Sequence, residues 1–267
     1  MDAAPRGPVV SELSLPFVVS PDRAWTVVTA DCMDVLRGLP DASVDHVIAD
    51  PPYDEKTHRC LREALNSGQA SPYARASRPN TIAVEFEELA DVAGVVVEQL
   101  RVCRRWVVDF CTMEMIADYK TAAGEAWVRS GFWYAPDRSP QFSGDRPAQA
   151  GDAVAIMHRS GRKRWNGGGH KAFWQCPVEH TDRVHGTQKP LPLLLRMLEQ
   201  FTDPGDLVLD THCGSGTTGV ACLRLGRRFL GVERDPTMAE TARERLRAEE
   251  RGLGILAARA GQQGLFG

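Results

Sequence analysis

The chain has 267 residues, of which 43% are hydrophobic and 25% are charged, a composition typical of a folded domain with a sizeable core. The net charge of −3 excludes a protein that coats nucleic acid through bulk positive charge. No segment offers the run of about 20 apolar residues that a membrane-spanning helix needs, and the N-terminal residues lack the apolar centre of a signal peptide. We expect a soluble, cytoplasmic protein with one main domain over residues 1–267.

The seven cysteines form an odd set without a C-x-x-C pair. This pattern favours neither a disulfide framework nor a zinc site, and we expect no metal.

Strand and helix patterns alternate along the chain. Short runs rich in Val, Ile, Trp and Phe predict seven strands, over residues 25–29, 45–49, 106–110, 131–135, 153–157, 207–210 and 228–233. Apolar residues three or four apart predict helices over residues 86–102, 113–127, 191–201, 217–225 and 237–248. The alternation predicts an α/β fold with a parallel, doubly wound sheet.

Two long stretches interrupt this alternation, over residues 54–81 and 136–187, and both are rich in Pro, Gly, Ser and Arg. Long loops in compact domains usually serve function, so we expect both stretches to contribute to it.

A glycine-rich turn follows the predicted strand 207–210. Gly214 and Gly216 let the backbone approach a ligand closely, and the free N–H groups at the start of the next helix favour a negatively charged partner. The following strand ends at Glu233, and an acid in that place usually accepts the hydroxyls of a ribose. The pattern predicts a nucleotide-like cofactor. Asp210 is equally suited to cap the helix, and Cys213 to plain packing.

The strand 45–49 leads into Asp50, Pro51, Pro52 and Tyr53. The amino group on a nucleobase is a poor nucleophile, because its lone pair is delocalised into the ring, and hydrogen-bond acceptors can localise it. Asp50 can accept from one N–H and the Pro51 carbonyl from the other, while Tyr53 can stack on the base. We predict Asp50, Pro51, Pro52 and Tyr53 as the catalytic residues; the alternative is a strand-ending turn.

The order of these motifs, D-P-P-Y, H-G-T-Q-K-P, D-x-x-C-G-S-G-T-T and then V-E, resembles the β-type amino-methyltransferases of DNA. The resemblance extends over nearly the whole chain. It implies a Rossmann-like, seven-stranded methyltransferase sheet, circularly permuted, and S-adenosylmethionine as the cofactor. It also implies that the strand ending at Asp210 lies beside the strand that leads into Asp50.

Other positions follow from the same resemblance. The segment 185–190 would contribute to the methionine end of the cofactor, with Lys189 pairing with its carboxylate. Asp31 would lie near the adenine of the cofactor, although a helix cap is an equally ordinary role. The implied cofactor-binding residues are Asp31, Cys32, Asp50, His185, Gln188, Lys189, Asp210, His212, Cys213, Gly214, Ser215, Gly216, Thr217 and Glu233.

The sequence departs from the family pattern where Thr211 and His212 replace Pro-Phe, and where Gly186 replaces Pro. Amino methylation needs no strong base, so we interpret His212 as a packing or stacking residue.

Because the net charge is −3, any contact with nucleic acid must come from a local basic segment. Residues 153–178 contain no acid, and they combine Arg and Lys with aromatic side chains. The residues predicted to contact DNA are Arg159, Arg162, Lys163, Arg164, Trp165, Asn166, His170 and Lys171. We therefore interpret residues 136–187 as a DNA-recognition insertion and residues 54–81 as a loop that closes over an extruded base. The alternatives are a solvated charged loop and a flexible linker.

The sequence predicts a site-specific DNA methyltransferase that acts on the N6 amino group of a flipped-out adenine, since D-P-P-Y is more typical of adenine-directed members. Methylation of cytosine N4, of RNA or of protein glutamine, and a binding module without activity, remain alternatives. We expect double-stranded DNA as partner, and a homodimer. The tail 254–267 resembles peptides that dock on the bacterial sliding clamp through Gln262, Leu265 and Phe266, or is a frayed end.

Overall fold

A computed structural model describes residues 23–53, 91–138, 140, 145–179, 183–184 and 187–253. Its strands are β1 (Trp25–Thr29), β2 (His46–Ala49), β3 (Trp106–Cys111), β4 (Trp127–Tyr134), β5 (Gly151–His158), β6 (Phe173–Gln175), β7 (Leu207–Asp210) and β8 (Arg228–Glu233). Its helices are α1 (Cys32–Gly38), α4 (Val92–Val102), α5 (Ile116–Ala123), α6 (Leu191–Phe201), α7 (Thr217–Arg224) and α8 (Pro236–Glu250), with a short 3-10 turn at Gly124–Ala126.

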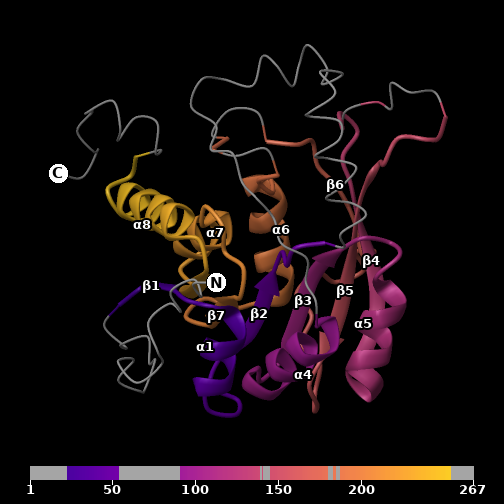
Figure 1. The fold of residues 1–267 in the computed structure, drawn as a ribbon, viewed down its shortest axis with the longest axis horizontal. Coiled ribbons are helices and arrows are strands. Elements are labelled where there is room, and N and C mark those ends of the chain that lie inside the picture. Colours follow the sequence, from indigo (N-terminus) through magenta and orange to yellow (C-terminus); the bar gives the residue numbers. More distant parts are fainter. Residues whose placement is uncertain are drawn as a thin grey trace, which may run out of the picture.

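All strands join one sheet in the order β1-β8-β7-β2-β3-β5-β4-β6 (Figure 1). The five strands from β1 to β3 are mutually parallel, whereas β5 runs antiparallel to both β3 and β4. The α/β fold predicted from the sequence is therefore confirmed, with eight strands in the described residues rather than seven. The sheet is not wholly parallel as predicted, because β5 runs against both of its neighbours. Circular permutation is a statement about other chains and stays a prediction.

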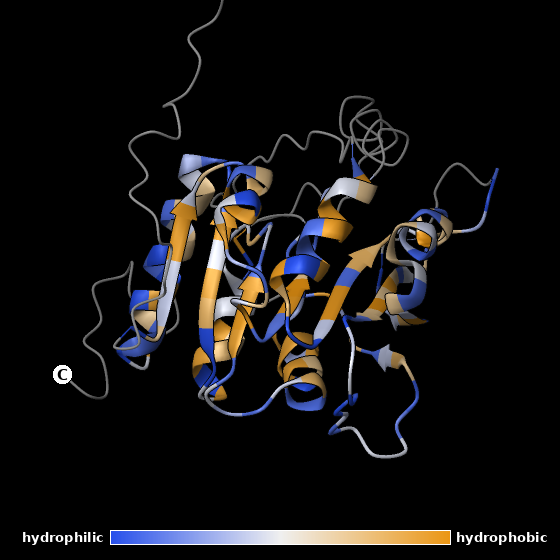
Figure 2. Ribbon diagram, turned by 90° about the horizontal axis from the view of Figure 1, so that it is seen from below, coloured by the Kyte–Doolittle hydropathy of each residue, from blue (hydrophilic) through white to orange (hydrophobic). Residues whose placement is uncertain are grey.

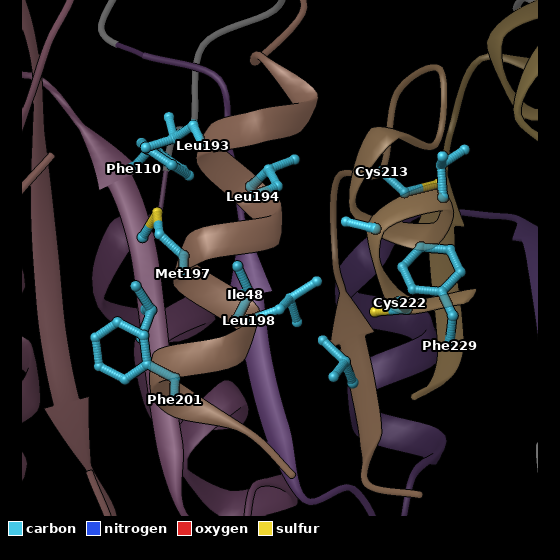
Figure 3. Packing of buried hydrophobic residues seen from close by; sticks show 14 of the residues in the cluster. Ile48, Phe110, Leu193, Leu194, Met197, Leu198, Phe201, Cys213, Cys222 and Phe229 are labelled. Atoms are coloured by element: carbon cyan, nitrogen blue, oxygen red, sulfur yellow. The ribbon is translucent and has the colours of Figure 1, made fainter. Parts of the chain in front are cut away.

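Helices cover both faces of the sheet. One core contains side chains from α6, α7 and α8, and the other contains side chains from α1, α4 and α5. The strands are therefore largely hydrophobic on both sides, as their colour in Figure 2 shows, which is typical of a buried parallel sheet. In Figure 3, Leu194, Met197 and Leu198 of α6 point towards the strands that carry Ile48 and Phe110.

The chain changes direction between β7 and β2, which lie side by side. From β2 the chain passes through α4 to β3, and from β7 it passes through α7 to β8 on the other side. Because α4 and α7 pack on opposite faces, the two connections diverge at the carboxyl ends of β2 and β7. Ligands of open α/β sheets bind at such a switch point.

Several predicted boundaries are corrected by the structure. The helix expected over 113–127 ends at Ala123, because Gly124 adopts a positive φ of 53° and Trp127 already begins β4. The helix expected over 86–102 begins at Val92, where the Asp91 side chain accepts from the Gly94 N–H; residues 86–90 lie outside the described part. The strand β6 and the helix α1 are additional elements.

Residues 54–81, and the tail 254–267 with the predicted clamp-binding residues, lie outside the described residues. Among the helices that the structure describes, none has the length and apolar character needed to cross a membrane.

Candidate active site

Asp50, Pro51, Pro52 and Tyr53 follow β2 directly, at the edge of the sheet where β7 also ends. The Tyr53 hydroxyl donates a hydrogen bond to Asp50 Oδ1 over 3.2 Å. The Asp50 side chain is 30% exposed, so it remains accessible from outside the protein. Burial nonetheless raises the pKa of Asp50, and the Lys189 ammonium counteracts that effect.

Lys189 joins this turn from the segment before α6, because its Nζ lies 2.6 Å from Asp50 Oδ2. The same Nζ lies 3.1 Å from the Tyr53 hydroxyl and 3.4 Å from Asp152 Oδ2 on β5. Asp152 in turn accepts from Arg138 Nη1 over 2.9 Å. Two carboxylates and two cations thus form one connected cluster.

The glycine-rich turn leaves β7 beside this cluster. Gly214 and Gly216 have positive φ values of 50° and 81°, a conformation that other residues adopt rarely. A Cβ at Gly216 would come within 3.0 Å of the Ala242 Cβ, so a side chain there would meet α8. The turn therefore presents bare backbone at the start of α7.

Glu233, at the end of β8, is bonded to the same turn. Its Oε2 accepts from the Gly214 N–H and its Oε1 from the Asp235 N–H, both over 2.9 Å. The two carboxylate oxygens together have four lone pairs, so the side chain keeps acceptor capacity for a further donor such as a ribose hydroxyl. Burial raises the pKa of Glu233, and the backbone N–H groups of Asp235, Gly214 and Arg234 counteract that effect.

Arg245 of α8 stabilises the glycine-rich turn through hydrogen bonds. Its Nη1 donates to the Ser215 carbonyl, the Ser215 hydroxyl and the Thr217 hydroxyl over 2.9–3.0 Å. Arg245 is only 2% exposed, so these bonds fix the turn to α8 without solvent competition.

Asp210 is buried and His212 is half-buried. Burial raises the pKa of Asp210 to about 7, and its Oδ1 accepts from the His212 N–H. Burial lowers the pKa of His212 to about 4, so the imidazole is neutral at physiological pH, and its Nδ1 lies 3.0 Å from the Thr211 hydroxyl.

Residues 131–244 match the family model described as DNA methylase, N6_N4_Mtase, which spans the strands β4 to β8 and the glycine-rich turn. This match covers less than half of the chain. The chain is similar over 83% of its length to the type II methyltransferase M.HinfI of Haemophilus influenzae, at 24% identity and over 68% of that protein. It is also similar to the type II methyltransferase M2.MboI of Moraxella bovis, at 25% identity, over 86% of this chain and 90% of the relative.

Solved structures agree on the fold. The complex of M1.HpyAVI with SAM superposes with a TM-score of 0.58 at 24% identity, over 83% of this chain and all of that chain. The PvuII DNA methyltransferase, which is cytosine-N4-specific, gives 0.59 at 14% identity over 83% of this chain and 86% of that chain. The methyltransferase fold expected from the sequence is therefore confirmed.

The structure gathers most residues predicted for the cofactor at one edge of the sheet. Asp31 and Cys32 follow β1, whose neighbour β8 ends at Glu233, and the Ala30 N–H donates to the Glu233 carbonyl. Asp31 caps α1 by accepting from the Met33 N–H, which is the ordinary role considered for it. Cys32 is buried at the start of α1.

Two further residues predicted to bind the cofactor, Cys213 and Gln188, contact other parts of the protein, and a third is not described. Cys213 is buried, and a Cβ at Gly231 would lie 2.8 Å from its Sγ, so the thiol packs against that strand. Gln188 directs its Oε1 to the Val184 N–H and so supports its own loop. His185 lies outside the described residues. Cofactor contact by these residues stays a prediction.

Sequence reasoning missed Asp152, Arg138 and Arg245. Asp152 was included in the interrupted stretch 136–187, and Arg245 in an ordinary helical pattern. A lone acid at the start of a hydrophobic strand was the one available signal for Asp152, which is 1% exposed.

The residues predicted to contact DNA begin at Arg159, at the edge of the sheet opposite to Asp50. Antiparallel β5 starts near Asp50 and ends at His158, which pairs with Trp106 at the start of β3. Arg159 donates to the carbonyls of Arg101 and Cys103, and Arg164 pairs with Asp203.

Other members of the segment also pack on the protein. The Asn166 amide donates to the Thr202 carbonyl, and Trp165 packs edge-on against Phe201. Arg162, Lys163, His170 and Lys171 are exposed. The segment therefore has a packing role for some members, and its contact with DNA stays a prediction.

Reversing the charge of Arg162 and Lys163 to Glu tests that contact, because both side chains are exposed. If each contacts a phosphate, the plot of log affinity against log salt becomes shallower by about 0.9 per contact. Fluorescence anisotropy with labelled duplex at several salt concentrations measures the slope. Arg37→Glu with Lys120→Glu is a matched control, since both side chains are exposed on α1 and α5. Equal slopes in the two double variants would assign the segment to packing alone.

Proposed function

We propose that the protein transfers the methyl group of S-adenosylmethionine to the N6 amino group of adenine in DNA, with the target base flipped out of the duplex. The match of residues 131–244 to the DNA methylase model and the similarity to type II methyltransferases support DNA methylation. The adenine assignment is carried by the Asp50-Pro51-Pro52-Tyr53 turn, which lies at the switch point beside the glycine-rich turn.

The residues of the turn fit a nucleotide cofactor. Gly214 and Gly216 leave the backbone open, and Glu233 keeps acceptor capacity for the ribose hydroxyls. The related structures M1.HpyAVI–SAM and a Thermus thermophilus protein were solved as complexes with this cofactor. When bound, S-adenosylmethionine supplies an electrophilic methyl group on a sulfonium.

The chain then acts mainly by positioning. The Asp50 carboxylate accepts one N–H of the adenine amino group and the Pro51 carbonyl accepts the other, which localises the nitrogen lone pair. Tyr53 provides an aromatic face for the base. Holding the nitrogen in line with its electrophile accounts for most of the rate enhancement, so a strong base is unnecessary. The neutral imidazole of His212 agrees with such a mechanism.

The test is direct. The purified protein is incubated with labelled S-adenosylmethionine and, in separate reactions, with unmethylated genomic DNA, total RNA or cell protein, and the hydrolysed products are separated by mass spectrometry. N6-methyladenine is expected. Label in N4-methylcytosine alone would replace adenine by cytosine as the target, and label only in RNA or in protein glutamine would reject DNA as the substrate.

We also propose a cytoplasmic location, a homodimer and a clamp-binding tail, as the sequence led us to expect. Light scattering measures the oligomeric state. A Leu265→Ala, Phe266→Ala variant that binds purified sliding clamp as well as the wild type would reject the docking peptide.

A further inference from the structure

Three oxygen atoms surround the ammonium group of Lys189. Its Nζ lies 2.6 Å from Asp50 Oδ2, 3.1 Å from the Tyr53 hydroxyl and 3.4 Å from Asp152 Oδ2. The Asp50 and Tyr53 oxygens accept hydrogen bonds from this ammonium, and Asp152 Oδ2 adds a negative charge at ion-pair distance. A cofactor carboxylate at the same place would compete with them and would meet the negative charges of Asp50 and Asp152.

The surroundings of Lys189 fix its position. The Nζ lies 5.0 Å from the ring centre of Phe110, 5.3 Å from that of Tyr53 and 5.7 Å from that of Trp133. Rings at this distance attract a cation and exclude water from it. Lys189 is 9% exposed, whereas Asp50 is 30% exposed, so the lysine lies behind the carboxylate and away from the open side of the site.

Asp152 anchors the lysine from the interior. It is 1% exposed on β5, and Arg138 donates to its other oxygen. Asp152 is paired with Arg138. Lys189 Nζ lies closer to Asp50 Oδ2, at 2.6 Å, than to Asp152 Oδ2, at 3.4 Å, so its main partner is Asp50.

We propose that Lys189 is a positioning residue that fixes the Asp50 carboxylate and keeps it ionised, and that it does not hold the carboxylate of the cofactor. The inference rests on the proposed function, in which an ionised Asp50 accepts a hydrogen bond from the target amino group. It assigns Lys189 a different role from the one implied by the family resemblance.

The charges around Asp50 give the sign of the effect. Burial and the charge of Asp152 raise the pKa of Asp50, while Lys189 and the Tyr53 hydroxyl lower it. The other titratable or charged groups that act on this region are Asp109 and Cys111 of β3, Asp210 of β7 and Arg138. Without Lys189, the pKa of Asp50 rises, and the carboxylate is lost at a higher pH.

The experiment compares Lys189→Met with the wild type. Carbon-13 NMR of the aspartate carboxyl groups follows the titration of Asp50 in the free protein, and the signal is identified by its absence in Asp50→Asn. We expect the titration to move upwards by about one to three pH units, the range typical for loss of a close opposite charge. The acid limb of the kcat profile should move in the same direction, while calorimetric affinity for S-adenosylmethionine stays within about threefold.

Two variants control this comparison. Lys189→Arg keeps the charge and should restore the titration midpoint in part. Arg105→Met removes another ion-paired cation, which contacts Asp203 and Asp206 at the opposite edge of the sheet, and should leave the titration of Asp50 unchanged. If Lys189→Met does not fold, Lys189→Gln keeps a hydrogen-bond donor without the charge and replaces it.

An unchanged Asp50 titration, together with cofactor affinity lowered tenfold or more, would overturn the inference and return Lys189 to the cofactor. Failure of the proposed function is distinguishable, because a wild type that does not methylate DNA still reports the effect of Lys189 on Asp50 in the NMR titration.

Discussion

Replacing Asp50 with alanine is expected to lower the rate of methyl transfer by about a hundredfold to a thousandfold, the usual cost of removing a group that stabilises developing charge. The target amino group loses the acceptor that localises its lone pair. Affinity for S-adenosylmethionine should change by no more than a few fold. Single-turnover transfer to duplex DNA and calorimetry of the cofactor measure the two quantities separately.

Asp50→Asn refines this result, since it preserves the shape of the side chain and removes only the charge. Asp206→Asn is the matched control, because Asp206 also pairs with an arginine, Arg105, and contacts His46, but lies at the opposite edge of the sheet. Asp206→Asn should lower the melting temperature and leave transfer intact. Turnover near the wild-type rate in Asp50→Ala would contradict the mechanism.

Replacing Glu233 with alanine is expected to weaken S-adenosylmethionine binding by about tenfold to a hundredfold, since hydrogen bonds to a charged group contribute about 1.5–3 kcal/mol. The variant also leaves the Gly214 N–H without its acceptor, which loosens the turn. Isothermal titration calorimetry measures the affinity. Gly214→Val should act in the same direction, because valine is strained at a φ of 50°.

Glu240→Ala is the control for Glu233→Ala, since Glu240 is an exposed acid on α8 that pairs with Arg243 and Arg247. It should bind the cofactor as the wild type does. Unchanged affinity in both Glu233→Ala and Gly214→Val would exclude the glycine-rich turn as the cofactor site.

The features predicted best from the sequence are those that depend on residues adjacent in the chain. The strands at 25–29, 207–210 and 228–233 agree with the structure to the residue, because each is a short apolar run between turn residues. The helix α1 was missed, since seven residues are too few for a helical period to emerge. The three-residue β6 was missed for the same reason, and its strand character comes from pairing with β4.

The resemblance implied that the strand ending at Asp210 lies beside the strand leading into Asp50, and this prediction is confirmed. Other relationships across the sheet were not readable from the sequence. The register of antiparallel β5 brings Asp152 beside Lys189 and carries Arg159 to the opposite edge. Nothing in the local pattern specifies that direction, because it depends on which strand β5 pairs with.

The pairing of β2 with β7 also affects how the protein folds. Asp45 and Leu207, which are hydrogen-bonded at the start of this pair, are 162 residues apart in the chain. Contacts between such distant residues form slowly, because the entropy of closing a long loop is lost before any bond is gained. During synthesis the catalytic turn leaves the ribosome long before the glycine-rich turn exists. Cofactor binding thus becomes possible only at a late stage of folding, and the cofactor then stabilises the completed domain by mass action.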